Sequence, residues 1–310
     1  MATTTSPELT KMAQPTAQPP VSSLTGGAPR PQHSRLGLTW IAFLAIFQRD
    51  VAVTLRDFIP FLLQVLIQPL FLLFIFGKIL PQIGATQHGF AAILLPGVVA
   101  LTIIITSLQS VTLPLVLDLG FAREIDDRLL APLPVALVAV EKILFAALRG
   151  LIAGAVIFPL ALWILGSDYN VRTDRLGMLI LVMVLISLVG AALGMVIGVL
   201  VKPEQISLMF ALIFTPLLFT GCSYYPWGSL GGIKWFQVLT LFNPLTYGSE
   251  GLRYAMTPDQ HITVHSHGFT QTITVAIPTL ATHWVYLGLV GTAVAFCVLG
   301  VWLFSRRVVS

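Results

Sequence analysis

The residues of this sequence that could do chemistry are few, and they stand in small groups between long apolar stretches. Only 10% of the 310 residues are Asp, Glu, Lys or Arg, against about 25% in an average soluble domain. The sequence shows no paired carboxylates, no nucleophile with a base and no set of metal ligands, and Glu250 is a lone candidate acid. The pattern argues against an enzyme, so the charged groups need another explanation.

One charged group lies in the segment 119–134, which reads LGFAREIDDRLLAPLP. Arg123 and Asp127 are four residues apart, as are Glu124 and Arg128, so opposite charges can pair along one side of a short helix. The other side of this helix would carry apolar residues: Phe121, Ile125 and Leu129. Such a helix predicts a docking surface for a partner. The alternative is a solvated charged face that contacts nothing.

A second charged group is formed by Glu250 and Arg253, which are three residues apart and follow an apolar run. Unpaired charges in such surroundings would be costly, so we expect the two side chains to pair with each other or with the backbone. Two interpretations stay open. The pair either takes part in function, or it only orients the helix that carries it without contacting a substrate.

Four polar residues stand inside apolar stretches that are otherwise almost uninterrupted: Gln64, Gln68, Gln109 and Arg149. Polar groups inside membrane spans usually face the helix bundle or a cavity. They are therefore candidates for a transport pathway. Hydrogen bonds from helix to helix would explain the glutamines equally well.

Three histidines, His261, His265 and His267, fall in the segment 258–283, where alternating polar and apolar residues predict a small β-hairpin around Gly268. Two imidazoles on one strand face could ligate zinc. With no cysteine or carboxylate set nearby, the sequence does not predict a metal site.

The elements that carry these groups are predicted to be membrane-spanning helices. Hydrophobic residues make up 56% of the chain, and they come in blocks long enough to cross about 30 Å of hydrocarbon, which takes about 20 helical residues. We predict an all-α polytopic membrane protein with six spans, at 58–80, 90–117, 143–165, 176–201, 206–221 and 284–304. After the fifth span, the segment 222–255 is broken by Pro and Gly and resembles a helical hairpin that dips back into the membrane; an external loop is the alternative.

The chain before the first span divides into two parts. Residues 1–37 are rich in Pro, Thr and Ser, and this composition predicts a disordered tail. Residues 38–57 have an amphipathic pattern, which predicts a helix lying along the membrane interface, although a polar lead-in to the first span is the alternative. The charges on its polar side are Arg49, Asp50, Arg56 and Asp57.

The distribution of Lys and Arg predicts how the spans are oriented. With six spans both termini share a side, and most basic residues fall on that side, in the tail and interfacial helix, the loops after spans two and four, and the C-terminus. By the positive-inside rule, both termini are cytoplasmic. The basic residues form no continuous stripe, so the net charge of +4 does not indicate a nucleic-acid partner.

Two segments resemble signatures of the permeases of ABC type-2 transporters. The run Asn243, Pro244, Leu245, Thr246 and Tyr247, followed by Glu250 and Arg253 and preceded by Gly221 and Pro226, is similar to the signature before their last span. The segment from Arg123 and Glu124 to Pro132 resembles their first cytoplasmic loop. The resemblance covers about 38–307 and is specific in the Asn-Pro-Leu-Thr-Tyr region. Ser249 departs from it, since many members have Val or Ile at that position.

The resemblance implies a permease made of two six-span halves, identical or paralogous, on two cytoplasmic ATPase subunits that bind ATP and Mg²⁺. The segment 119–134 would then be a coupling helix seated on the ATPase, with Arg123, Glu124, Asp127, Arg128 and Leu129 on its surface. The re-entrant segment would close the external end of the pathway. Export from the plasma or inner membrane is the usual direction, and drugs, lipids and glycolipids are the usual cargo.

Independently of the resemblance, the chain contains no G-x-x-x-x-G-K-[ST] motif. It is therefore not expected to bind ATP itself, and the motor would be another polypeptide. An ion-coupled secondary transporter is the main alternative, but it would need carboxylates deep in the spans, and none can be placed there. A membrane-embedded transferase is the weaker alternative.

Overall fold

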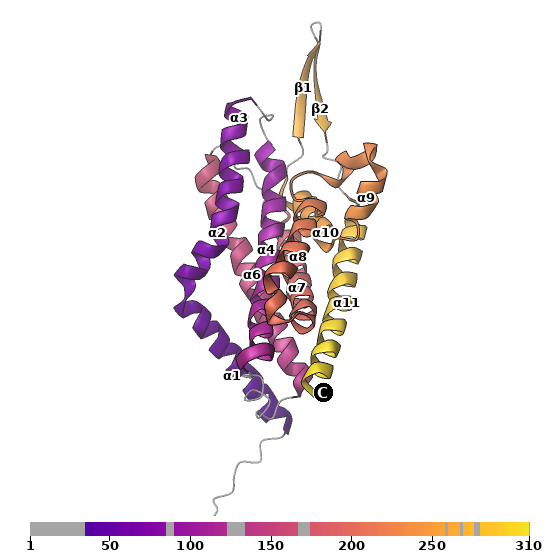
Figure 1. Ribbon diagram of the computed structural model, residues 1–310. Coiled ribbons are helices and arrows are strands. Elements are labelled where there is room, and N and C mark those ends of the chain that lie inside the picture. Colours follow the sequence, from indigo (N-terminus) through magenta and orange to yellow (C-terminus); the bar gives the residue numbers. More distant parts are fainter. Residues whose placement is uncertain are drawn as a thin grey trace, which may run out of the picture.

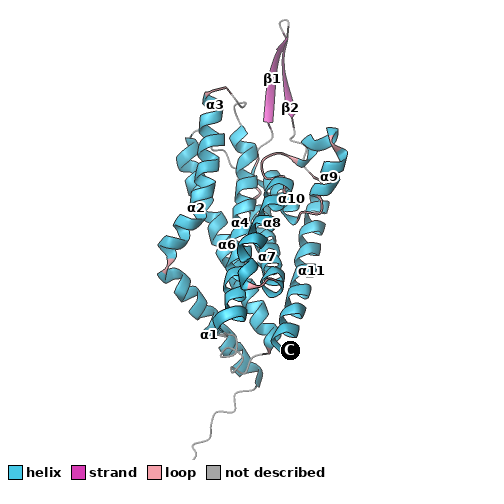
Figure 2. Ribbon diagram, in the orientation of Figure 1, coloured by secondary structure: helices cyan, strands magenta, loops and turns pink. Residues whose placement is uncertain are grey.

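The computed structural model of the protein describes 35–84, 90–122, 134–166, 174–257, 260–266, 269–275 and 280–309 (Figure 1). Within these residues, six helices are long and apolar enough to cross a membrane: Phe58–Gln82, Ile93–Gly120, Val135–Leu165, Leu176–Leu200, Pro203–Thr220 and Thr282–Val308. The predicted fold class, an all-α protein with six spans, is confirmed. Two short strands are the one addition to the helices of the described part (Figure 2).

Several spans contain a change of helix type. The first consists of α2 (Phe58–Phe74), a π-helical turn (Ile75–Ile79) and α3 (Leu80–Gln82), and the second of α4 (Phe90–Leu117) and a π-helical turn (Asp118–Ala122). The third and fourth are α6 (Val135–Leu165) and α7 (Leu176–Leu200). The fifth joins a 3₁₀ turn (Pro203–Gln205) to α8 (Ile206–Thr220), and the sixth is α11 (Thr282–Val309).

Helices α4 and α7 form the centre of the bundle. In their most apolar stretches 78% and 67% of the residues are buried, against 6% for the span that contains α8. Glycines bring the two central helices together, because a Cβ on Gly190 or Gly194 would lie only 2.7 or 2.5 Å from a carbonyl oxygen of α4. Close backbone approach through small residues is a common way to pack membrane helices. The peripheral helices α2, α8 and α11 therefore surround a tightly packed central pair.

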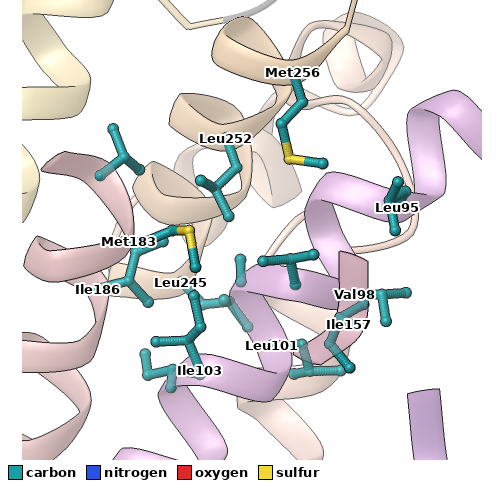
Figure 3. Close-up of a cluster of buried hydrophobic side chains, with 14 of the residues drawn as sticks. Leu95, Val98, Leu101, Ile103, Ile157, Met183, Ile186, Leu245, Leu252 and Met256 are labelled. Atoms are coloured by element: carbon teal, nitrogen blue, oxygen red, sulfur yellow. The ribbon is translucent and has the colours of Figure 1, made fainter. Parts of the chain in front are cut away.

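A short helix after the fifth span, α10 (Pro244–Met256), belongs to the core of the bundle and not to its surface. Figure 3 shows Leu245, Leu252 and Met256 of α10 facing buried side chains of α4, α6 and α7. Before α10 lie a 3₁₀ turn (Trp227–Gly232) and α9 (Lys234–Thr240). Whether this segment re-enters the membrane stays a prediction.

Helix α6 extends further toward the N-terminus than residue 143, the predicted start of the third span. Helix α6 begins at Val135, directly after Pro134, and therefore includes Glu141 and Lys142, both of which are buried. Lys142 lies just before the predicted span, since a charge inside a span is unfavourable. In the structure its Nζ lies 3.4 Å from a carboxylate oxygen of Asp118 at the end of α4, and this partner offsets the charge. The other span ends lie within a few residues of the predicted ones.

Helix α1 (Arg35–Arg56) precedes the first span, and the chain changes direction between α1 and α2 (Figure 1). One side of α1 contacts α6: Phe47 stacks edge-on against Phe145, and Ile46 packs against the adjoining hydrophobic cluster. Trp40 and Leu55 are exposed, as expected of a helix in contact with lipid. The position of α1 along the membrane interface stays a prediction, and the tail 1–34 lies outside the described residues.

Strands β1 (Gln260–Ser266) and β2 (Phe269–Val275) form an antiparallel pair in which Gln260 lies opposite Val275 and Ser266 opposite Phe269. They occupy the segment where alternation predicted a hairpin, and in Figure 1 they project beyond the helices. His261 and His265 are on β1, whereas His267 lies outside the described residues. The prediction that these histidines form no metal site stays a prediction.

Candidate functional site

The first residues of α10 tie this helix to the end of α8. The side-chain oxygen of Asn243 accepts from the backbone N–H of Leu245 (2.9 Å) and so caps the helix, while Pro244 occupies the first turn. The amide nitrogen of Asn243 donates to the carbonyl oxygen of Leu217 (3.0 Å) and to the Thr220 hydroxyl (2.9 Å). The Asn-Pro pair thus both starts α10 and holds it against α8.

Three hydroxyl groups attach α10 to the end of α9 and to the residue after α8. The Thr246 hydroxyl lies 2.6 Å from the carbonyl oxygen of Thr240 at the end of α9. The Tyr247 hydroxyl donates to the carbonyl oxygen of Leu241 (2.9 Å), and the Ser249 hydroxyl donates to the carbonyl oxygen of Gly221 (3.0 Å). Ser249, where the sequence departs from the family pattern, therefore has a structural partner in this chain.

Glu250 and Arg253 form an ion pair, and both side chains are fully buried. Each guanidinium nitrogen of Arg253 has an acceptor: Nη1 donates to Glu250, Nη2 to the carbonyl oxygen of Cys222 (3.0 Å) and Nε to that of Ile93 (3.3 Å). The other contacts of Glu250 are backbone N–H groups, that of Trp227 at 2.9 Å and that of Leu280 at 3.1 Å. Every charge of the pair is therefore offset by a hydrogen bond.

We call this set the clasp: the side chains of Glu250 and Arg253 with the backbone groups of Ile93, Cys222, Trp227 and Leu280. It joins α10 to the beginning of α4, the turn after α8, the 3₁₀ turn at Trp227 and the residues before α11. Buried charges without partners are strongly destabilising, whereas each guanidinium nitrogen and each carboxylate oxygen of this pair has at least one partner. The geometry supports the interpretation in which the pair orients α10.

The turn that the clasp holds is conformationally unusual. Cys222 has a φ of +51°, in the left-handed region that residues other than Gly rarely adopt. The next residue, Ser223, presses its carbonyl against Gly97 of α4, where a Cβ would overlap the oxygen. Burial, and next the charge of Glu250, raises the pKa of the Cys222 thiol to about 11. The thiol is therefore neutral and unreactive at physiological pH.

Two further predicted gate residues border this turn. Gly221 ends α8 and is buried, and a Cβ there would lie 2.6 Å from the Leu217 carbonyl oxygen and from the Leu245 side chain. Pro226 precedes the 3₁₀ turn and so sets the position of Trp227, whose N–H contacts Glu250. The predicted gate residues thus all lie in α10 or in the segments attached to it: Gly221, Pro226, Asn243, Pro244, Tyr247, Glu250 and Arg253.

A second region is a cavity of about 360 Å³ between α2, α4, α6 and α8. All four polar residues predicted for a pathway line it: Gln64 and Gln68 from α2, Gln109 from α4 and Arg149 from α6. Sequence reasoning missed the hydroxyl residues on the same wall, Thr102, Thr106 and Ser110. These three residues are four apart and Gln109 is three from Thr106, so all four lie along one side of a helix. This spacing is the signal in the sequence that could have identified them.

The environment of Arg149 differs from that of Arg253. Its guanidinium carbon lies 4.7 Å from the centre of the Phe61 ring, a cation–π contact. Its Nε is buried, and no acceptor for it exists within the described residues. No Asp or Glu lines the cavity. The cavity therefore carries a positive charge that the described part of the protein does not neutralise.

The predicted coupling residues Arg123, Glu124, Asp127, Arg128 and Leu129 lie outside the described residues. The structure describes what flanks them. Gly120 lies against Pro203 so closely that a Cβ would overlap the proline ring. The segment after the second span thus begins beside the start of the fifth.

Comparisons with known proteins agree with the fold. A model of the family described as ABC-2 type transporter matches residues 41–257. The inner membrane transport permease YadH of Escherichia coli K12 is 26% identical over 220 residues, which cover 70% of this chain and 83% of that protein. The protein of the same name from Shigella flexneri matches with the same identity and coverage. The family match includes α1 from residue 41 on, the residues that line the cavity and the whole of α10.

Proposed function

Because this chain belongs to the ABC-2 type transporter family, we propose that it is the permease subunit of an ATP-driven exporter that moves a hydrophobic or amphipathic molecule outward across the inner membrane. Its cargo is a drug, a lipid or a glycolipid. The observation that carries the proposal is the cavity, which combines polar and apolar walls within the spans. A site for an amphipathic cargo needs both.

In this proposal the motor is a separate ABC ATPase in two copies, which bind ATP and Mg²⁺. The absence of a G-x-x-x-x-G-K-[ST] motif from the sequence supports this division of labour. A second permease half, identical or paralogous, completes the transporter. Both termini and the segment 119–134 are cytoplasmic, so the charged helix predicted there contacts the ATPase.

The clasp has a mechanical role in the proposed cycle. ATP-driven closure of the ATPase pair pushes the coupling helix, and the spans tilt together with α1. Because the clasp connects α10 to α4, to the turn after α8 and to the start of α11, α10 follows any movement of these helix ends. It would thereby open and close the external end of the pathway without contacting the cargo.

Two measurements test the proposal. The purified full chain should capture a Walker-motif ATPase from its own cells, and lipids or drugs should stimulate ATP hydrolysis by the reconstituted complex. Reversing two charges, Glu124→Arg with Arg128→Glu, should abolish this stimulation. Capture of no such ATPase would contradict the proposal, and unchanged stimulation in the reversed variant would remove the coupling role of 119–134.

An ion-coupled secondary transporter has less support. The carboxylates in the described spans are Asp118, Glu141 and Glu204, and all three lie near the same end of the bundle. Glu141 is only six residues from the first residue of α6, or about 9 Å along the helix. Transport driven by an ion gradient in vesicles without ATP would favour this alternative.

A further inference from the structure

The cavity has one charged group, and that group is deep in the bundle. Arg149 lies near the middle of α6, about 21 Å along the helix from its beginning at Val135. Charged side chains at such depth are costly and usually pair with an opposite charge or serve a function. Within the described residues no carboxylate forms an ion pair with Arg149 or lines the cavity around it. A negative charge supplied from outside the chain would complete the site.

The contacts of Arg149 leave it able to bind such a group. The Phe61 ring covers one side of the guanidinium, which orients the planar group without using its N–H donors. The Nε–H is enclosed and has no acceptor, and neither Nη nitrogen makes a hydrogen bond or an ion pair within the described residues, so the Nη groups are the donors left for a ligand. A guanidinium that is positioned but has free donors is suited to carboxylate and phosphate oxygens.

The neighbouring polar groups offer both donors and acceptors. Gln64 and Gln68 are one turn apart on α2, and Gln109 reaches the cavity from α4. Pro69 and Pro114 also line the cavity. Because proline has no N–H, the carbonyl oxygen four residues before each of them lacks its usual helical hydrogen bond. Amides and carbonyls of this kind suit hydroxyl groups attached to an acidic headgroup.

The remaining wall is apolar. Phe61, Ile67, Leu72, Leu113 and Phe210 contribute to it, from α2, α4 and α8. An inorganic anion would leave this surface without a partner, whereas the acyl chains of an amphiphile would cover it. The volume of about 360 Å³ falls within the range of small-molecule sites.

We propose that this cavity binds an anionic amphiphile, whose acidic headgroup pairs with Arg149 while its chains lie along the apolar wall. The cargo of the transporter would then be an acidic lipid or acidic glycolipid. The cargo assignment rests on the proposed export function, but the binding site does not. It can therefore be tested on the permease chain alone.

The experiment uses the purified full chain in an uncharged detergent. Bound fluorescent phosphatidylglycerol is displaced by unlabelled phosphatidylglycerol or by phosphatidylcholine with the same chains, and the two competitors are compared. We expect phosphatidylglycerol to compete about 10- to 100-fold better in the wild type, the range that charge-assisted hydrogen bonds provide. Arg149→Gln should reduce this preference to about twofold or less, and Arg149→Lys should retain part of it.

A matched control is Arg175→Gln. Arg175 also stacks on an aromatic ring, that of Tyr254 at 4.3 Å, but it does not line the cavity, so its loss should leave the preference unchanged. If Arg149→Gln does not fold, Gln68→Glu provides an independent test, because it keeps Arg149 and places a negative charge on the cavity wall. This variant should also lose the preference.

Three results would overturn the proposal. One is equal competition by the two lipids in the wild type. Another is a preference that survives both Arg149→Gln and Gln68→Glu. The third is displacement by glycerol 3-phosphate as effective as that by phosphatidylglycerol, which would mean that the site recognises a free anion and not an amphiphile. Because no ATPase is present, each of these results can occur whether or not the export function is correct.

Discussion

Arg253 and Arg149 both lie among the helices of this protein, but their surroundings differ. Arg253 has an acceptor for each guanidinium nitrogen, a fully buried carboxylate among them. Arg149 has an aromatic ring on one side, a cavity beside it and an Nε without an acceptor in the described structure. The first charge is built into the fold, and the second is available to a ligand. The depth of a charge therefore says less about its role than the completeness of its partners.

The largest expected effect is on stability and comes from breaking the clasp. Arg253→Gln would leave Glu250 as a buried charge without its partner, and removal of one member of such a pair typically costs about 3–5 kcal/mol. We expect a much lower yield of folded protein and a much lower unfolding temperature in detergent. Replacing both residues, by Glu250→Gln with Arg253→Met, should recover part of the loss.

The reactivity of Cys222 gives a second measurement on the same variant. The chain has two cysteines, so Cys297→Ser leaves Cys222 as the only thiol. Maleimide should label Cys222 very slowly in an otherwise wild-type chain, because the thiol is buried and its pKa is raised to about 11. Arg253→Gln should speed labelling, and Arg149→Gln should not. Equal labelling and equal stability of all three chains would show that the clasp does not hold this turn.

The next largest effect on stability is expected where α4 packs against the turn that the clasp holds. Gly97→Ala would place a Cβ on the carbonyl oxygen of Ser223, which is backbone and must shift. Overpacking of this kind costs about 1–3 kcal/mol. Gly177→Ala in α7 is the control, since a Cβ there meets nothing within 4 Å and Ala is the better helix former. Thermal unfolding should separate the two variants, and equal unfolding temperatures would contradict the contact.

A smaller effect on stability is expected from removing the cap of α10. Asn243→Ala removes the acceptor for the Leu245 N–H and the donor to the Leu217 carbonyl, at a cost of about 0.5–2 kcal/mol. Asn243→Ser keeps a neutral cap acceptor but not the bond donated to Leu217, so its unfolding temperature should fall between those of wild type and Asn243→Ala. A serine variant no more stable than the alanine variant would show that the cap contributes little.

The smallest effect on stability is expected at Arg149. Arg149→Gln removes a cation–π contact but no ion pair within the described residues, so we expect a change of about 1 kcal/mol or less. Lipid-stimulated ATPase activity of the assembled complex should nevertheless fall strongly. A loss of stability as large as that of Arg253→Gln would mean that both arginines are structural, and the contrast between them would be lost.

Much of this arrangement could be predicted from the sequence. The spans were predictable because apolar blocks of the required length have few other uses. Gln64, Gln68, Gln109 and Arg149 could be found because each interrupts an apolar helix, and the structure gathers them at one cavity. Helix α6 begins before the predicted third span because the buried Lys142 has a partner, Asp118, from another segment, and the local sequence does not indicate this pairing.

The clasp was only half predictable. The spacing of Glu250 and Arg253 indicated an ion pair, and the two do pair. Their other partners are backbone groups of Ile93, Cys222, Trp227 and Leu280. Every residue has a carbonyl, and nearly every residue has an N–H, so side-chain identity carries no signal for such contacts. Only the tertiary fold selects which of these groups meet.

The clasp also bears on how the chain is made. Its parts are far apart in the order of synthesis: the Ile93 carbonyl emerges early, Cys222 much later, and the N–H of Leu280 only as the last span begins. Until that point one oxygen of Glu250 lacks its partner, so α10 cannot take its final place while the nascent chain is still incomplete. The arrival of the last span thus completes the clasp, and a chain released before residue 280 would carry an unfinished one.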